Sequence, residues 1–339
     1  MTSPTPIPIP IPATAANSTD GGRESVLVCT APELGILDFT GPDAESFLQG
    51  QLSSDLKALV PGSVQLSSYN SPKGRMLATL MLWREGAESI RALVPPDVAE
   101  YLRKRLGMYV MRAKLVVVDT TSMHMLFGIA GAGASSTATQ VFGCSPDRGQ
   151  VLVGETKTLL GLPDGRIVVL LPAATDDSRV AQLAARATAI TPEYWRWLGI
   201  RAGVPTIGAA TQDLFVLQTA NWDLLDGVSF QKGCYPGQEI VARTQYLGRL
   251  KERMQLFHVD GPPPPPATKL YGNVYGDQAC GTVVDAAPAP EGGADLLAVV
   301  QLSALDGPLR VGTPDGSAVA LLPLPYAIPA PAKVNRPKL

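Results

Sequence analysis

Short apolar stretches alternate along the chain with stretches of helical period, and turn residues separate them. Strand-like runs at Val64–Tyr69 and Met76–Trp83 flank a tight turn at residues 71–74, which predicts a hairpin. A proline followed by an acidic residue begins a helical pattern at Pro96 and again at Pro192. Interleaved strands, hairpins and helices predict an α+β fold in which helices cover a sheet.

Residues 123–190 repeat this mixture on a smaller scale. Strand-like runs occur at Met123–Ile129 and Arg166–Leu171, and a helical pattern occupies Ser178–Ala187. After the proline run 262–266 the pattern changes to short strands separated by Gly, Pro and Asp. This density of turns predicts a small antiparallel β-barrel or sandwich.

The changes of pattern divide the chain into three units between two tails. Residues 1–23 and 331–339 contain prolines among small or polar residues, and we expect both to be disordered. The expected units are a discontinuous α+β domain (residues 24–120 and 191–250), a second α+β domain (121–190) and a C-terminal β-barrel (251–330).

The composition is that of a globular protein and limits the classes of partner. Of 339 residues 45% are hydrophobic, yet no run of 18 apolar residues could span a membrane. A net charge of −2, with Lys and Arg spread along the chain, argues against strong direct nucleic-acid binding. The four cysteines form no CxxC pair and only two histidines are present, so we expect no metal site and a reduced, cytoplasmic setting.

Chemically distinctive side chains are concentrated in residues 232–239, Lys-Gly-Cys-Tyr-Pro-Gly-Gln-Glu. Gly233 and Gly237 permit a sharp turn, and the apolar residues that follow predict a helix beginning just after Gly237. Cys234 would then lie near the positive end of a helix dipole and beside Lys232, and both favour its thiolate. The alternative is a glycine-rich turn around a packed cysteine.

These eight residues fit the pattern K-G-C-[FY]-x-G-Q-E and in this resemble the YgfZ family, folate-binding relatives of the aminomethyltransferase (T-protein) of the glycine cleavage system. The resemblance covers most of residues 25–255. Its further segments are Leu37–Leu56, Ser71–Arg75, Arg196–Pro205 and Gly227–Phe230.

The resemblance implies a T-protein-like ring of three domains, two ferredoxin-like α+β units and an antiparallel β-barrel, around a central hole. It implies that the hole binds tetrahydrofolate or a one-carbon derivative, and that the protein supports the assembly or repair of iron–sulfur cluster enzymes. The expected partners are those enzymes or cluster-assembly proteins, and tRNA modification would be affected indirectly. Cys234 corresponds to the residue that such proteins need, and Trp195 resembles the tryptophan that contacts folate.

Three features depart from the related pattern. Ala78 and Thr79 stand where T-proteins carry a pair of aspartates, so one-carbon transfer is not expected. Arg201 replaces a glutamate that would pair with the pterin, and an arginine accepts no hydrogen bond. Leu34 stands near the place of a second tryptophan.

The expected site has a reactive part and a binding part. Its catalytic candidates are Cys234 and Lys232, supported by the motif residues Gly233, Tyr235, Gly237, Gln238 and Glu239. A folate also needs an aromatic face, amide groups and a cation, for which the candidates are Trp195, Gln218, Asn221 and Arg243.

Each binding candidate also has a purely structural interpretation. Trp195 could be a core aromatic, and Gln218 and Asn221 could be helix-cap or loop residues. Arg243 follows Glu239 by one helical turn, so the two could form an ion pair. Lys232 could steady the Cys234 thiolate or face solvent.

The resemblance and these residues together leave three functions to compare. We favour a folate-binding accessory factor for iron–sulfur enzymes in which Cys234 acts by thiol chemistry or transient cluster contact. A folate-dependent aminomethyl- or methyltransferase is the alternative, which Ala78 and Thr79 oppose. A direct tRNA-binding protein is the third, which the net charge opposes.

Overall fold

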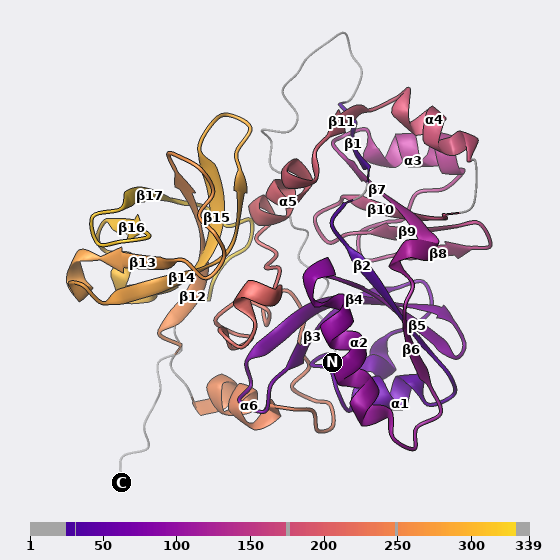
Figure 1. Cartoon of the computed structure of the whole chain (residues 1–339), viewed down its shortest axis with the longest axis horizontal. Coiled ribbons are helices and arrows are strands. Elements are labelled where there is room, and N and C mark those ends of the chain that lie inside the picture. The colour runs from indigo at the N-terminus through magenta and orange to yellow at the C-terminus, as the bar shows by residue number, and fades with distance from the viewer. Residues whose placement is uncertain (1–24, 31, 174–176, 248–249, 330–339) are drawn as a thin grey trace.

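The computed structural model describes residues 25–30, 32–173, 177–247 and 250–329, which form three lobes, each built on one sheet (Figure 1). The tails expected at residues 1–23 and 331–339 lie outside the described residues. Two lobes are α+β and the third is a closed antiparallel barrel, which confirms the fold class. In the described part of the chain, no helix has the length and apolar character needed to cross a membrane.

The first lobe is a five-stranded sheet with strand order β3-β4-β5-β2-β6. Helix α2 (Pro96–Val110) begins at the predicted proline and buries Val98, Leu102 and Leu106, which lie on one helical face. The other elements are β2 (Gly35–Thr40), α1 (Ala44–Gln49), η2 (Leu56–Ala58), β3 (Val64–Asn70), β4 (Met76–Gly86), β5 (Ser89–Val94) and β6 (Val116–Asp119).

The second lobe is a six-stranded sheet with strand order β11-β1-β7-β10-β9-β8. Its strand β1 (Leu27–Thr30) pairs antiparallel with β7 and parallel with β11. This strand therefore belongs to a different sheet from residues 35–119, with which the sequence pattern grouped it, because its ladder partners lie far along the chain. The other elements are η3 (Thr121–Met123), β7 (His124–Ala130), α3 (Ala134–Phe142), β8 (Val151–Gly154), β9 (Lys157–Gly161), β10 (Ile167–Pro172), α4 (Ser178–Ala184) and β11 (Thr188–Ile190).

The third lobe is the predicted β-barrel, closed in the order β12-β15-β14-β13-β16-β17. A register shift between Val283 and Asp285 marks a β-bulge in β14, on the side that faces the rest of the molecule. The elements are β12 (Glu252–Val259), β13 (Lys269–Gly272), η5 (Asn273–Tyr275), β14 (Ala279–Pro288), β15 (Ala294–Gln301), η6 (Leu302–Ala304), β16 (Leu309–Val311) and β17 (Ser317–Leu322).

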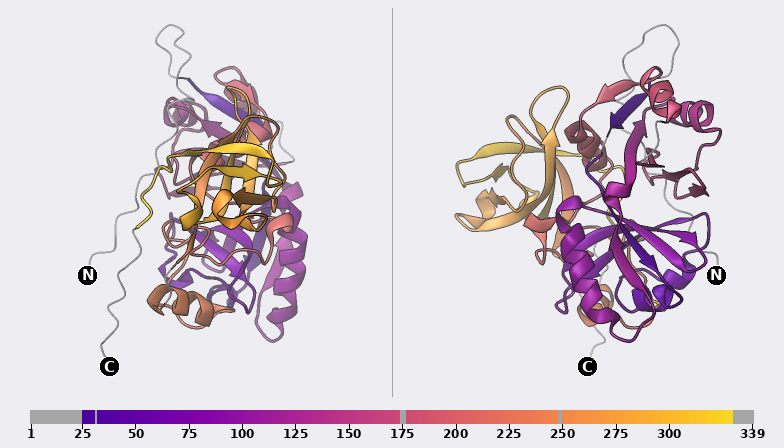
Figure 2. Two further views of the ribbon diagram at one scale, coloured as in Figure 1. Left: turned by 90° about the vertical axis from the view of Figure 1, so that its left-hand side faces the viewer. Right: turned by 45° about the vertical axis from the view of Figure 1, so that its right-hand side comes forward.

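The segment between β11 and the barrel joins the lobes. Helix α5 (Pro192–Arg201) packs against β14 and β15 of the barrel and against β1 of the second lobe. The chain then passes through η4 (Ala209–Thr211) to α6 (Gln238–Leu247), beside the β3–β4 hairpin. The right-hand view of Figure 2 shows the barrel beside the two stacked α+β lobes, and α5 lies between the barrel and the second lobe.

Candidate functional site

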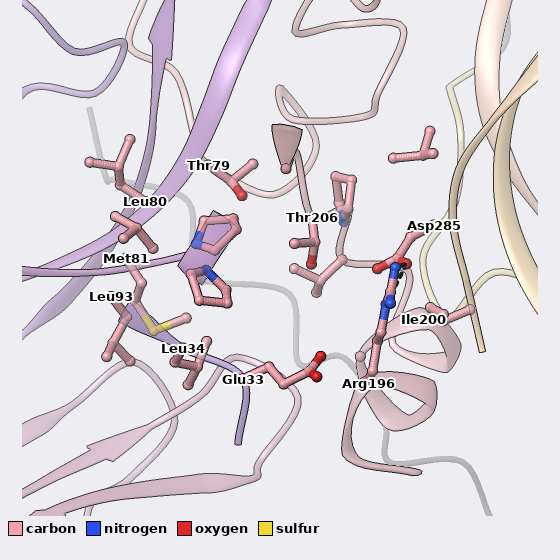
Figure 3. A pocket seen from close by; sticks show the side chains of 18 of the residues that line it. Glu33, Leu34, Thr79, Leu80, Met81, Leu93, Arg196, Ile200, Thr206 and Asp285 are labelled. Carbon is pink, nitrogen blue, oxygen red and sulfur yellow. Dashed lines mark hydrogen bonds and ion pairs between the residues drawn. The ribbon is translucent and has the colours of Figure 1, made fainter. Parts of the chain in front are cut away.

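A cavity of about 420 Å³ lies where the three lobes meet, and this size is within the range of small-molecule sites. Leu80 and Leu93 line it from the five-stranded sheet and Asp285 lines it from the barrel (Figure 3). Val168 of the six-stranded sheet and Val284 of the barrel line it as well. Successive residues of a regular strand point to opposite faces, so the bulge in β14 accounts for two neighbours on one wall.

An ion pair between Asp285 and Arg196 joins the barrel to α5 at the cavity wall (Figure 3). Arg196 Nε donates to Asp285 Oδ1 at 2.6 Å, and the Ala286 backbone N–H donates to the same oxygen at 2.8 Å. Asp285 is 2% exposed. This burial raises the pKa of its carboxyl, although the Arg196 charge opposes the effect.

Trp195 also lines the cavity, but most of its ring is already covered. The side chain is 6% exposed, and the Arg166 guanidinium lies 4.3 Å from the ring centroid. Gly128 packs on the ring so closely that a Cβ there would lie 2.6 Å from it. Trp195 therefore serves in large part as a core aromatic that holds Arg166 at the cavity. Trp222, which the sequence did not single out, lines the cavity as well.

Gln218 and Asn221 are fully buried and are not among the residues that line the cavity. Gln218 Nε2 donates to the Val241 carbonyl at 2.8 Å, and Asn221 Nδ2 donates to the Met254 carbonyl at 2.9 Å. Asn221 has φ = +59°, a conformation that asparagine tolerates well. Both amides thus tie the chain to α6 and β12, and the structural interpretation holds for them in place of the binding one.

Lys232 is buried and binds the end of α1 and the loop that follows it, rather than facing solvent. Its Nζ donates to the backbone oxygens of Gln49 and Leu52 at 2.6 Å each and of Ser54 at 2.8 Å. These bonds use all three N–H groups of the ammonium, so none remains for Cys234. Burial lowers the pKa of Lys232 to about 8, and the charge of Asp55 opposes this shift.

Gly237 attaches the second half of the motif to the first lobe. It has φ = +80° and packs on the β3–β4 hairpin, where an added Cβ would lie 2.5 Å from the Gly74 Cα. Helix α6 begins at the next residue, Gln238, which confirms the predicted helix start. Tyr235 is buried between these two anchors, and burial raises the pKa of its hydroxyl to about 12.

Cys234 is exposed, and its neighbour Gly233 borders open space. The alternative of a packed cysteine is therefore wrong, because the buried neighbours hold the loop while the thiol faces outward. The other cysteines differ: burial raises the pKa of Cys29 to about 11 and also raises that of Cys280, and Cys144 is half-buried. The described residues that line the cavity include none from 232–239.

Glu239 and Arg243 are both exposed on α6, and within the described residues they form no ion pair. Arg243 does not line the cavity, so it is not the cation near the expected ligand; Arg166 and Arg196 are. Arg196 directly follows Trp195 in a helix predicted from the sequence. Its position next to that candidate could have identified Arg196 as a cavity residue. Gln238, another predicted motif residue, contacts the motif itself: its Nε2 lies 3.5 Å from the Lys232 carbonyl oxygen.

The positions that depart from the T-protein pattern differ in their relation to the cavity. Thr79 and Leu34 line it, whereas Ala78 is buried in the core of the first lobe. Arg201 points to the barrel, with its NH1 group 3.5 Å from Asp295 Oδ2, and does not line the cavity. The described residues contain no group of three or more His, Cys, Asp or Glu placed to hold a metal ion.

The three-lobed fold with its central cavity places the protein in the structural class of the glycine cleavage aminomethyltransferases. The crystal structure of aminomethyltransferase T from Bartonella henselae matches it with a TM-score of 0.72, covering 90% of this chain and 87% of that one. The two sequences are only 14% identical, so this likeness shows the fold alone.

Sequence comparison defines the family more closely, although no protein-family model matches the chain. The tRNA-modifying protein YgfZ of Serratia proteamaculans is 32% identical over 300 residues, which cover 86% of this chain and 90% of the relative. That of Edwardsiella ictaluri is 34% identical over 300 residues, covering 86% and 89%. That of Escherichia coli O127:H6 is 29% identical over 317 residues, covering 91% and 96%. The chain therefore belongs to the YgfZ family.

Proposed function

We propose that this protein is a tetrahydrofolate-binding accessory factor for iron–sulfur cluster enzymes, with the folate in the central cavity and Cys234 acting at a separate surface. The observation that carries the folate part is the cavity itself, with mainly apolar walls and a few polar groups near Arg196 and Asp285. Effects on tRNA modification, which the names of the relatives suggest, would arise through the cluster enzymes that modify tRNA.

The residues of the cavity fit the chemistry of a reduced folate. The pyrimidine ring of its pterin is flat and carries adjacent N–H donors, which require an apolar surface and hydrogen-bond acceptors. Leu80, Met81 and Leu93 supply the apolar surface, and the Asp285 carboxylate supplies an acceptor. When bound, the folate would carry a one-carbon unit, while these side chains bind and orient its rings.

The alternative, a folate-dependent aminomethyltransferase, finds less support. Thr79 replaces an expected acid at the cavity wall, and its hydroxyl accepts a hydrogen bond from the Ile207 N–H at 3.3 Å. Ala78, at the other position, has no carboxylate and is buried in the core of the first lobe. Turnover of a lipoyl-bound aminomethyl donor would support the transferase instead.

The thiol part of the proposal rests on how Cys234 is presented. Lys232 and Tyr235 are buried on either side of it, so the loop is anchored while the sulfur stays accessible. An accessible thiol on an anchored loop suits contact with a large partner, such as a cluster enzyme or a cluster-assembly protein. This surface is distinct from the cavity.

Calorimetric titration with 5-formyltetrahydrofolate tests the folate part. Thr206 lies at the exposed edge of the cavity, so Thr206→Trp would fill the cavity entrance without disturbing the core (Figure 3). We expect binding by the wild type and by Cys234→Ser, and a loss of at least tenfold in affinity for Thr206→Trp. No binding by the wild type would refute the folate part.

A further inference from the structure

The Asp285 carboxylate has one oxygen that is fully engaged and one that is not. All the hydrogen bonds that it forms with the described residues end on Oδ1, from Arg196 and from the Ala286 N–H. Oδ2 has no hydrogen-bond partner in the described part of the chain, although Asp285 is 2% exposed and lines the cavity. Among the described residues it is not one of the fully buried side-chain atoms that lack a partner, so it is accessible from the cavity, where a ligand or water can complete its bonding.

The backbone and the ion pair both fix this carboxylate in the cavity wall. The bulge between Val283 and Asp285 turns the side chain toward the cavity, and Arg196 Nε holds Oδ1 at 2.6 Å. In Figure 3 the Asp285 carboxylate lies at the cavity beside the Arg196 guanidinium. The free oxygen is therefore presented in one orientation, which is what recognition of a rigid ring requires.

The charges nearby favour a ligand group that donates hydrogen bonds over one that is anionic. Glu33 and Asp97 line the same cavity, so three carboxylates, with Asp285, lie near Arg196. The other guanidinium that lines the cavity, that of Arg166, is already paired with Asp164 at 2.6 Å. Arg196 is itself turned toward Asp285. A negatively charged glutamate tail would be repelled here, whereas the N–H groups of an aminated heterocycle would be attracted.

We propose that Asp285 is the residue that recognises the head group of the ligand, its Oδ2 accepting hydrogen bonds from the 2-amino group and the adjacent ring N–H of a reduced pterin. Arg196 is a positioning residue that holds Oδ1. The inference rests on the proposed folate binding and adds the orientation of the ligand, with its pterin at the barrel wall.

A second ion pair between α5 and the barrel provides a matched control. Asp295 lies on β15, is buried, and accepts hydrogen bonds from Trp197 Nε1 at 2.8 Å and from Arg201 at 3.5 Å. It does not line the cavity. Asp295→Asn therefore weakens the same interface between α5 and the barrel without changing the proposed acceptor.

The experiment compares two probes by calorimetry: 5-formyltetrahydrofolate, and its analogue with hydrogen in place of the 2-amino group. We expect the wild type to prefer the first about 10- to 100-fold, the effect of hydrogen bonds to a charged acceptor. Asp285→Asn should reduce the preference to about threefold or less, and Asp295→Asn should keep it. Thermal unfolding of each variant confirms that it is folded.

The outcomes separate this inference from the function on which it rests. If the wild type binds neither probe, the proposed folate binding fails. If it binds both equally, or if folded Asp285→Asn keeps the full preference, folate binding stands and the role of Asp285 is overturned. If Asp285→Asn does not fold, the test is the preference of the wild type for the probe that carries the 2-amino group. Equal binding of the two probes then contradicts the proposed recognition.

Discussion

Gly237 lies directly against Gly74, so that a Cβ on Gly237 would stand only 2.5 Å from the Gly74 Cα. This contact fastens the residues after Cys234 to the β3–β4 hairpin, as Lys232 fastens the residues before it to the loop after α1. Cys234 is exposed between these two attachments. The accessibility of its thiol is thus built by contacts that are distant in sequence.

The Gly237 contact predicts that Gly237→Ala destabilises the protein. The substitution combines φ = +80°, which costs an L-residue about 1–2 kcal/mol, with overpacking, which costs about 1–3 kcal/mol. We therefore expect urea unfolding to show a loss of about 2–5 kcal/mol. Gly233→Ala is the matched control, because open space surrounds that position, and it should change stability by less than about 0.5 kcal/mol. Equal effects of the two would contradict the packing described for Gly237.

Lys232→Met should also destabilise the fold, because it leaves three backbone carbonyls without their common donor. We expect a loss of about 2–4 kcal/mol in unfolding free energy. Lys73→Met removes an exposed lysine from the neighbouring hairpin and should be close to neutral. If both variants unfolded at the wild-type urea concentration, Lys232 would not anchor the motif.

The pH dependence of stability tests the environment of Lys232 independently. Burial lowers its pKa to about 8 in the folded protein, from 10.5 in the unfolded chain. Between these values the unfolded chain binds more protons at this residue, so stability increases with pH. Relative to Lys232→Met, the wild type should therefore gain stability as pH rises from about 8 toward 10.5, and change little below 8. A relative loss over that interval would mean that the three carbonyls hold the ammonium form more strongly than burial opposes it.

Thiol labelling should distinguish Cys234 from the buried cysteines. We expect a maleimide to modify Cys234 rapidly in the folded protein, and Cys29 and Cys280 only after unfolding, because both are buried and burial raises their pKa values. Cys234→Ser should abolish the rapid phase and alter stability by less than about 0.5 kcal/mol. Cys29→Ser should leave the rapid phase intact. If that variant lost the rapid phase, the reactive thiol would be Cys29 and not Cys234.

Local signals were sufficient to predict much of the fold. Pro96 and its following acid mark the start of α2, and the turn-rich pattern after residue 262 predicts the barrel. The strand β1 could be predicted as a strand but not placed, because its partners in β7 and β11 are fixed by long-range pairing. Local periodicity indicates which face of a strand is buried, but not which distant strands pair with it.

The site was less predictable, because chemistry can be inferred from residue types whereas orientation cannot. Gln218 and Asn221 have suitable amides, yet backbone carbonyls occupy their N–H groups. Lys232 binds backbone oxygens, which every sequence possesses and which therefore leave no signal. Asp285 reaches the cavity through a bulge in a barrel strand, a feature that only the structure reveals.

The roles of the cavity and of Cys234 are tested together by the activity of an iron–sulfur enzyme in cells that lack this protein and express the wild type, Thr206→Trp or Cys234→Ser. Both variants should fold but fail to restore activity, Thr206→Trp because folate binding is lost and Cys234→Ser because the thiol is lost. Purified Thr206→Trp should still be labelled at Cys234, and Cys234→Ser should still bind 5-formyltetrahydrofolate. Full restoration of activity by Cys234→Ser would show that the thiol is not needed for the function proposed for this protein.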